Sequence, residues 1–207
     1  EFYGRSSDII YPPVDTGEHL VSREDRGYYL VVSALVPYKR VDLAVKAFTG
    51  NGRRLVVIGE GNVSEDVRQG AGPNVEFLGW TDDTKLREYY SLATALIFPG
   101  EEDFGIVPLE AQAHGKPVIA YGKGGALETV VPLEGQGSCV KGHGGGATGV
   151  YFPEQTVEAL NKAVEEFEMN RDKFDPDVIR ANALRFGRDR YRNEIREYIE
   201  SKLEIVV

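Results

Sequence analysis

Residues 98–130 read FPGEEDFGIVPLEAQAHGKPVIAYGKGGALETV. Three acids, Glu101, Glu102 and Asp103, precede an apolar segment, 104–115, that has the character of a helix and stops at Gly115. A short apolar run at 116–122 is typical of a buried strand, and a glycine-rich loop with Lys123 leads into another helix start. Together with the apolar run at 94–99, which is also typical of a strand, the order of strand, helix and strand predicts a βαβ unit, in which the two strands are parallel.

The same alternation extends in both directions from this stretch. In the segment 41–48, Val41, Ala44, Val45 and Phe48 recur at helical spacing. We expect strands at residues 28–35, 54–59, 74–80, 94–99, 116–122 and 147–152. We expect helices at 40–48, 63–69, 81–93, 104–115 and 156–170, with two charged helices within 177–203. The pattern predicts an α/β protein with a Rossmann-like, doubly wound parallel sheet, whose ligands bind at the carboxyl ends of the strands.

Three ranges divide the chain. Residues 1–27 contain Pro-Pro and no long period, which indicates a linker or an edge strand at the start of the domain. Residues 28–170 form the expected Rossmann-like domain, and 171–207 supply C-terminal helices. Within the domain, the glycine-rich segment 132–146 is typical of a mobile surface loop.

Composition excludes several classes of function. The 207 residues are 42% apolar and 28% charged, which is typical of a globular domain. The net charge of -9 disfavours a nucleic-acid groove. The single cysteine, Cys139, permits no intrachain disulfide and shares a glycine-rich loop with His143, which makes a poor metal site. We therefore expect a reducing compartment and no metal centre. The apolar runs are too short for a membrane span, and the start at Glu1 suggests a piece of a longer protein.

Two cationic segments are candidates for anion binding. Lys39 and Arg40 lie at the start of the first helix, where cations oppose the helix dipole, and a bound anion would remove that conflict. The alternative is that both side chains are simply solvated. Lys123 with Gly124 and Gly125 could form an anion nest before a helix, or a plain loop that needs positive φ.

The acidic residues also allow two interpretations. Glu110 could be a capping-box residue in the first turn of its helix, and Glu101, Glu102 and Asp103 could be a solvated loop. Alternatively, Glu102 and Glu110 accept hydrogen bonds from the hydroxyls of a ligand, because carboxylates are acceptor-only and their hydrogen bonds are charge-assisted. The residue chemistry alone does not decide between the two.

Other motifs favour structural roles. GEGNVS (59–64) imitates a dinucleotide fingerprint, but Ser64 replaces the last glycine and the motif follows the second strand. Asp82 and Asp83 suit helix capping better than metal binding. His114, near the end of a helix, suits the negative end of the helix dipole.

The opening stretch closely resembles the signature of the family 4 retaining glycosyltransferases, which have the GT-B fold. Glu102 and Glu110, with seven residues between them, match the family's Glu-x7-Glu motif. The segments SALVPYKRVDLAVKAF, VVIGEGN and NVEFLGW match other family blocks in the family's order. The resemblance covers about residues 12–203 and is nearest to bacterial mannosyltransferase-like enzymes of surface polysaccharide synthesis. It implies one half of a GT-B enzyme.

By position, the resemblance assigns particular residues to the sugar and the phosphates of a nucleotide-sugar donor. Lys39 would neutralise the diphosphate and Glu102 would contact sugar hydroxyls; these two are the implied catalytic residues. Phe104, Gly105 and Ile106 would offer backbone groups to the sugar or phosphates.

The resemblance assigns the nucleoside to other residues. Glu110 would hold the ribose hydroxyls. Gly59 and Gly61 would let their loop approach the nucleotide. The backbone from Leu78 to Trp80 would line the base.

Two departures from the family pattern bear on function. The family usually has an arginine five residues before the lysine, where this chain has Ala34, and Arg40 stands where many members have glycine. We hypothesise that Arg40 supplies part of the missing charge. The acceptor-binding, N-terminal half of a GT-B enzyme is absent from this sequence, and the C-terminal helices would pack on the domain and towards that half.

The resemblance implies a retaining hexosyltransferase that uses a GDP-mannose-like donor, or a UDP-sugar, and a glycan or lipid-linked acceptor. The donor is a substrate, and no cofactor is required. We expect the isolated chain to be inactive, to lie in the cytoplasm, and to approach the inner face of the membrane only through the missing half. One alternative is a non-catalytic nucleotide-binding module. Another is a nicotinamide-dependent enzyme, which the incomplete glycine fingerprint disfavours.

Overall fold

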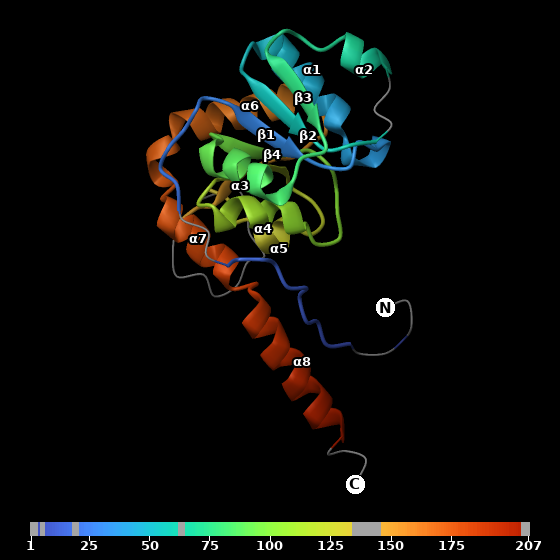
Figure 1. Ribbon diagram of the computed structural model, residues 1–207, viewed down its shortest axis with the longest axis vertical. Helices are drawn as coiled ribbons and strands as arrows, with labels where there is room; N and C mark the ends of the chain where they lie inside the picture. Colours follow the sequence, from blue (N-terminus) through green and yellow to red (C-terminus); the bar gives the residue numbers. More distant parts are fainter. Residues whose placement is uncertain (1–3, 5–6, 18–20, 62–64, 134–145, 204–207) are drawn as a thin grey trace.

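The computed structural model describes residues 4, 7–17, 21–61, 65–133 and 146–203 (Figure 1). Its centre is a six-stranded parallel sheet with the order β3-β2-β1-β4-β5-β6. The strands are β1 Tyr29–Val32, β2 Leu55–Ile58, β3 Val75–Gly79, β4 Ala95–Phe98, β5 Val118–Tyr121 and β6 Gly149–Phe152. All six predicted strands are present, and the predicted Rossmann-like, doubly wound α/β fold is confirmed.

Helices follow the strands as the sequence pattern predicts. The α-helices are α1 Val41–Asn51, α2 Glu65–Gln69, α3 Asp83–Leu92, α4 Ile106–Ala113, α5 Ala126–Thr129, α6 Val157–Met169, α7 Pro176–Leu184 and α8 Arg188–Leu203. Short 3-10 turns, η1 Pro37–Lys39 and η2 Arg171–Lys173, precede α1 and α7. The prediction that Asp82 caps its helix is confirmed, because its carboxylate accepts a hydrogen bond from the Lys85 amide at 2.9 Å.

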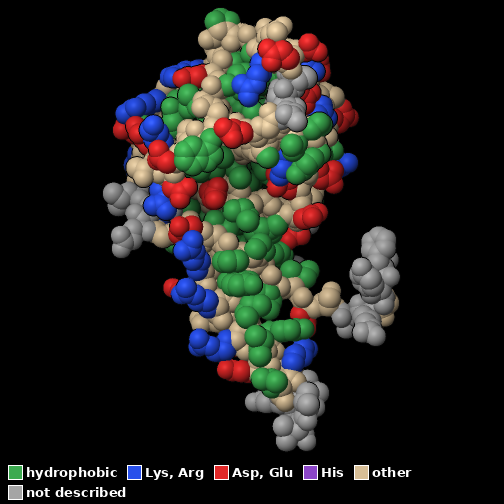
Figure 2. Space-filling view, turned by 45° about the vertical axis from the view of Figure 1, so that its right-hand side comes forward, with side chains coloured by type: hydrophobic (Ala, Val, Ile, Leu, Met, Phe, Trp, Pro, Cys, Tyr) green, Lys and Arg blue, Asp and Glu red, His purple; other side chains and the backbone are tan. Residues whose placement is uncertain are grey.

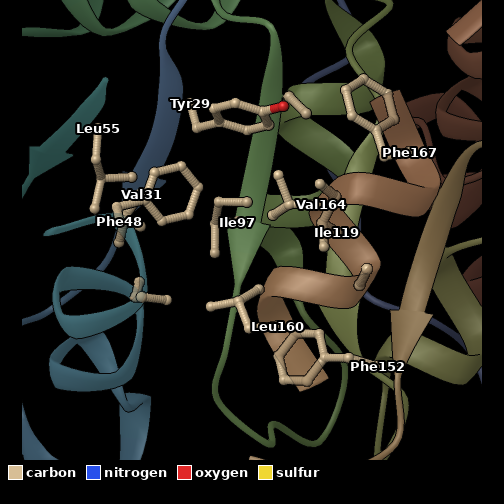
Figure 3. Close-up of a cluster of buried hydrophobic side chains, with 14 of the residues drawn as sticks. Tyr29, Val31, Phe48, Leu55, Ile97, Ile119, Phe152, Leu160, Val164 and Phe167 are labelled. Atoms are coloured by element: carbon tan, nitrogen blue, oxygen red, sulfur yellow. The ribbon is translucent and has the colours of Figure 1, made fainter. Parts of the chain in front are cut away.

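Alternate residues along the strands face two separate cores, as the two-residue period of a strand requires. One core packs α1 and α6 on the first face of the sheet, where Phe48, Leu160 and Phe167 meet Val31 and Ile97 (Figure 3). The other core packs α3, α4 and α5 on the opposite face. The strands, buried on both faces, are the continuous apolar runs seen in the sequence.

The strand order reverses direction between β1 and β4. These two strands pair in parallel, with Tyr29 opposite Ala95, but the chain leaves β1 towards one face and β4 towards the other. The loops after them therefore diverge at the carboxyl edge of the sheet. Such a switch point is where open α/β sheets form a ligand crevice.

The C-terminal helices behave differently from one another. Helix α7 packs on α4, and Asn182 is buried there, where it donates hydrogen bonds to Gln112 and to the Thr129 carbonyl. Helix α8 extends away from the body of the molecule (Figure 1). Figure 2 shows hydrophobic side chains gathered along this extension, and among them Ile199 and Leu203 are 52% and 63% exposed.

The N-terminal segment is not an edge strand in the part that the structure describes. Val14 forms only an isolated bridge to Gly187, beside the start of α8, and the linker interpretation of residues 1–27 stays a prediction. The expected mobile loop at 132–146 falls almost entirely on residues outside the described ranges. No helix in the described ranges has both the length and the apolar composition for a membrane crossing.

Candidate functional site

A cleft of about 680 Å³ opens at the switch point. The loop after β1, the 3-10 turn before α1, and the loop and first turn after β4 line it. Its lining includes the predicted residues Lys39, Glu102, Phe104, Gly105 and Ile106. The structure thus brings together the five residues assigned by resemblance to the sugar and the phosphates, although they come from two separate loops.

Lys39 and Glu102 form an ion pair inside this cleft. Lys39 Nζ lies 2.5 Å from Glu102 Oε1, and the two side chains are only 17% and 22% exposed. The ammonium also lies over the Tyr38 ring, 5.1 Å from its centroid, where the ring face attracts it. Tyr38 also lines the cleft and is exposed, although the sequence interpretation did not single it out. Its position next to Lys39 was the signal that the sequence offered.

The cleft is acidic. Among the described residues that line it, Lys39 is the only cation, and it faces Glu101, Glu102 and Asp103. Ala34, which stands where the family usually has arginine, also lines the cleft and is exposed. An anion that enters meets more negative than positive charge.

Glycines lock the neighbouring loops together by close backbone contacts. A Cβ on Gly59 would lie 1.9 Å from the Ser33 carbonyl oxygen, and one on Gly61 would lie 2.6 Å from that of Leu35. Both glycines have positive φ. In the structure, the space beside these glycines is filled by the loop after β1. The assignment of Gly59 and Gly61 to donor binding therefore stays a prediction.

The loop with Lys123 meets the acidic loop in the same way. A Cβ on Gly125 would lie 2.2 Å from Phe104 Cα, and the Gly125 amide donates a hydrogen bond to the Glu102 carbonyl at 2.7 Å. Gly124 has φ +59, as the plain-loop interpretation requires. The Lys123 ammonium lies over the Tyr121 ring, 5.5 Å from its centroid. These glycines fix the backbone that carries Glu102.

The first turn of α4 lines the cleft, and no side chain caps its backbone amides. Gly105 is the N-cap, with φ +86. The Phe104 ring packs against Tyr11 and Phe186, with centroid distances of 5.3 and 5.6 Å. The amide groups at this helix start form a site of positive potential suited to a phosphate.

Glu110 lies one turn further along α4 and lines a second cavity of about 220 Å³ between α3 and α4. The capping-box interpretation is wrong, because α4 begins at Ile106 and Glu110 lies beyond its first turn. Its carboxylate accepts a hydrogen bond from Tyr90 at 2.9 Å. Burial raises the pKa of Glu110, the Tyr90 hydrogen bond opposes this rise, and Asp15 and Asp83 add to it.

The sequence interpretation missed Tyr90, although its helical spacing from Leu86 predicted a place on the buried side of α3. His114 is buried and stacks on the Tyr90 ring, with centroids 5.3 Å apart. Its ring Nδ1 lies 2.9 Å from the Glu110 carbonyl oxygen. The interpretation of His114 as structural agrees with this packing, and His114 also lines the second cavity.

Arg40 is not among the described residues that line the cleft. Its guanidinium forms hydrogen bonds of 3.3 Å with Asp42 and with Gln155. Its backbone adopts φ +53, the one positive φ of a non-glycine residue in the described ranges. Asp42 and Gln155 engage Nε and one terminal nitrogen of the guanidinium, so the hypothesis that Arg40 supplies part of the missing charge stays a prediction.

Leu78 and Trp80 lie at the end of β3, on the far side of β2 from the switch point. Leu78 packs into the second core, whereas Trp80 is 72% exposed. Neither belongs to the described lining of the two cavities. In the described ranges no three His, Cys, Asp or Glu side chains are arranged to hold a metal ion.

Comparison with known proteins identifies the family of the chain. Residues 17–184 match the model of the family "Glycosyl transferases group 1". The chain belongs to this family. The match begins within the N-terminal segment and ends with α7, so it includes the whole sheet, the helix that packs on α4, and the lining of both cavities except Pro12 and Asp15.

Several of the curated relatives are mannosyltransferases. A GDP-mannose-dependent alpha-(1-6)-phosphatidylinositol monomannoside mannosyltransferase of Mycobacterium tuberculosis is 31% identical over 167 residues, which are 72% of this chain and 40% of that protein. The alpha-1,3/1,6-mannosyltransferase ALG2 of Kluyveromyces lactis is 37% identical over 97 residues, 44% of this chain and 18% of that protein. The chain thus spans less than half the length of these relatives.

Solved structures of glycosyltransferases share the fold. Sucrose-phosphate synthase from Thermosynechococcus elongatus matches with a TM-score of 0.70 at 24% identity, over 95% of this chain and 50% of that one. HepE of Anabaena, in complex with UDP and glucose, matches with a TM-score of 0.65 at 21% identity, over 86% of this chain and 49% of that one. The chain has the fold of one Rossmann-like half of a GT-B glycosyltransferase.

Proposed function

We propose that this chain is the donor-binding half of a retaining glycosyltransferase that transfers a hexose from a nucleotide sugar. The observation that carries the proposal is the cleft at the switch point, where Lys39, Glu102 and the uncapped start of α4 converge. A diphosphate would take the Lys39 ammonium and the α4 amides, while Glu102 would accept hydrogen bonds from sugar hydroxyls.

The rest of the donor would extend along α4. The first turn lines the cleft and Glu110, one turn on, lines the second cavity, so a ribose held by Glu110 would lie about 6 Å along the helix from the phosphates. The exposed Trp80 and the backbone from Leu78 would meet the base. No metal enters this scheme, because the ammonium and the helix start stabilise the leaving diphosphate as preorganised charge.

A GDP-mannose-like donor is favoured. The mycobacterial relative that carries this name shares 31% of its matched residues with the chain, whereas UDP appears only among structural matches below 25% identity. The acceptor, a glycan or a lipid-linked sugar, would bind in a second half that the chain does not contain. Transfer would therefore need that half, at the inner face of the membrane if the acceptor is lipid-linked.

Ala34 keeps the second candidate open. The cleft that the described residues line is acidic, with a single lysine, and a weakly held donor would suit a nucleotide-binding module without transferase activity. Restoring an acceptor half distinguishes the two candidates. A donor that is bound but never transferred would favour the module.

Calorimetric titration tests the proposal. The chain is titrated with GDP, UDP, ADP and their sugar nucleotides, without and with magnesium. We expect one nucleotide to bind, and Lys39→Ala and Glu110→Ala each to weaken it about tenfold or more, because each removes a charged partner (hydrogen bonds to charged groups contribute roughly 1.5–3 kcal/mol). Equal affinity in all three proteins would contradict the assigned site.

A further inference from the structure

We propose that the Lys39–Glu102 ion pair makes the cleft discriminate between a nucleotide sugar and the nucleoside diphosphate left after transfer. This inference rests on the proposed function, in which the diphosphate binds Lys39 and the sugar binds Glu102. The pair acts as an internal competitor. It penalises any diphosphate that arrives without a sugar.

The geometry of the pair makes it an effective competitor. Lys39 Nζ and Glu102 Oε1 are 2.5 Å apart, and both side chains are about four-fifths buried. A diphosphate that binds the ammonium competes with the Glu102 carboxylate for the three N–H donors of Lys39. Separating a largely buried pair leaves a charge without its partner, which is costly unless new partners replace the lost one.

Close contacts between the two loops oppose any backbone movement that would relieve this competition. A Cβ on Gly100 would lie 3.0 Å from Lys39 Cα, and a Cβ on Gly124 would lie 2.3 Å from the Glu102 carbonyl oxygen. The Gly125 amide also holds that carbonyl. Because the two loops are packed this closely, exchange of partners must occur by rotation of the two side chains.

The surroundings determine which ligand restores the balance. Once Lys39 has turned to a diphosphate, Glu102 is left beside Glu101 and Asp103, two further carboxylates that line the cleft. Sugar hydroxyls are hydrogen-bond donors and would satisfy the Glu102 carboxylate. A nucleoside diphosphate without a sugar offers no donor at this position. The sugar of the full donor replaces the partner that Glu102 loses when the ion pair breaks, whereas the spent nucleotide provides no replacement.

The expected consequence concerns product release. The pair re-forms as soon as the sugar has left, because Glu102 then competes again for Lys39. The affinity for the spent nucleoside diphosphate is thereby lowered relative to the affinity for the sugar nucleotide. A single carboxylate would serve both to recognise the sugar and to expel the product.

The test measures two affinities in the chain and its variants. GDP and GDP-mannose, and UDP and UDP-glucose if those do not bind, are titrated into the unchanged chain and into Glu102→Gln. We expect Glu102→Gln to bind the diphosphate about fivefold more tightly or better, and the sugar nucleotide no more tightly. Glu101→Gln is the matched control, since it removes one charge from the same cleft at a residue for which the described ranges show no ion pair.

A double-mutant cycle isolates the pair. In a Lys39→Ala background, the gain from Glu102→Gln should vanish, because no ammonium remains to be released. A gain that survives there, or that only equals the gain from Glu101→Gln, overturns the inference. If Glu102→Gln does not fold, Glu102→Asp withdraws the carboxylate with its charge retained, and the same gain in diphosphate affinity is expected.

The two proposals fail in different ways. Nucleotide binding that Glu110→Ala does not weaken contradicts the proposed site whatever Glu102→Gln does. If Glu110→Ala weakens nucleotide binding but Glu102→Gln brings no specific gain in diphosphate affinity, the proposed function stands. The same result refutes the role of the Lys39–Glu102 ion pair as a competitor. Absence of binding in both the unchanged chain and Glu102→Gln contradicts both.

Discussion

At the scale of single residues, Ala34 is the position where the cleft departs most clearly from a site for anions. It is exposed in the lining, opposite an excess of carboxylates. Ala34→Arg should raise the affinity for the bound nucleoside diphosphate roughly tenfold, which is about 1.4 kcal/mol, because it adds a charge-assisted hydrogen bond. The gain should shrink as salt rises from 50 to 500 mM, because salt screens exposed charges.

Ala34→Gln is the control for this prediction, since it adds a long polar side chain without charge. Calorimetry at the two salt concentrations provides the measurement. An equal gain in both variants would show that packing or neutral hydrogen bonding is responsible, and the acidity of the cleft would lose its significance.

Arg40 permits a prediction whose sign is unusual. At φ +53, a residue with a Cβ is strained by roughly 1–2 kcal/mol relative to glycine. Arg40→Ala and Arg40→Gly both remove the contacts to Asp42 and Gln155, so their difference reports the backbone alone. We expect the glycine variant to have the larger free energy of unfolding, by about 1 kcal/mol, in urea denaturation. The reverse order, normal at helical positions, would argue against the left-handed conformation.

At the scale of elements, the loops at the carboxyl edge hold the site through glycine contacts. Gly125 has φ −64, so alanine there meets no backbone strain, yet its Cβ would lie 2.2 Å from Phe104 Cα. Gly125→Ala should lower the free energy of unfolding by about 2 kcal/mol or more and weaken nucleotide binding, because the loop with Glu102 must shift. Gly50→Ala in α1, where a Cβ meets nothing within 4 Å, should instead stabilise by about 0.5–1 kcal/mol.

Urea denaturation and nucleotide titration of the two glycine variants decide this prediction. Equal stability of Gly125→Ala and the unchanged chain would mean that the loops are free to separate. That result would also remove the fixed backbone on which the exchange at Lys39 and Glu102 depends.

The contact between α3 and α4 should make stability depend on pH through Glu110. Its pKa in the folded chain is raised above the ordinary value of 4.5, mainly by burial. Between those two values the folded state binds more protons than the unfolded state, so the free energy of unfolding falls as pH rises through this window. Glu110→Gln cannot ionise but can still accept the Tyr90 hydrogen bond. It should match the unchanged chain below pH 4 and be more stable at pH 7.

Denaturation curves from pH 3.5 to 8 measure this difference. Tyr90→Phe, which removes the hydrogen bond that opposes the rise, should move the transition to higher pH. A flat difference between Glu110→Gln and the unchanged chain would contradict the raised pKa. Because Glu110→Gln should also weaken nucleotide binding, it would show a functional carboxylate retained at a cost in stability.

The elements also show how far sequence patterns reach. Apolar runs and helical spacing predicted every strand and the main helices, because those signals are local. The seven-residue spacing located Glu102 and Glu110, but the pattern could not show that they line two different cavities. The close fit of Gly59 against Ser33, and of Gly125 against Phe104, was equally hidden, since each contact joins loops that follow different strands.

At the scale of the whole molecule, the body and α8 differ in how they are covered. Helix α7 is tied to α4 by Asn182 and by the Arg180 guanidinium, which donates to the Ala113 carbonyl at 2.5 Å. Helix α8 has no buried residue in the described ranges, and Tyr198, Ile199 and Leu203 remain exposed on it. Figures 1 and 2 show that α8 projects from the body and carries apolar side chains, and the prediction that the C-terminal helices pack towards an acceptor half would give this surface a partner.

This difference predicts local stability in the isolated chain. Most helical stability comes from tertiary packing, so the amides of residues 195–203 should exchange with solvent near the rate of a frayed helix, while those of α7 and β4 exchange only on global unfolding. Hydrogen exchange followed by mass spectrometry measures both. Ile199→Ser should leave the free energy of unfolding within about 0.5 kcal/mol, whereas Ile179→Ser, at a fully buried position on α7, should lower it by 2 kcal/mol or more. Strong protection of α8 that disappears on dilution would instead mean that a second copy covers this surface, and the acceptor half would have to displace it.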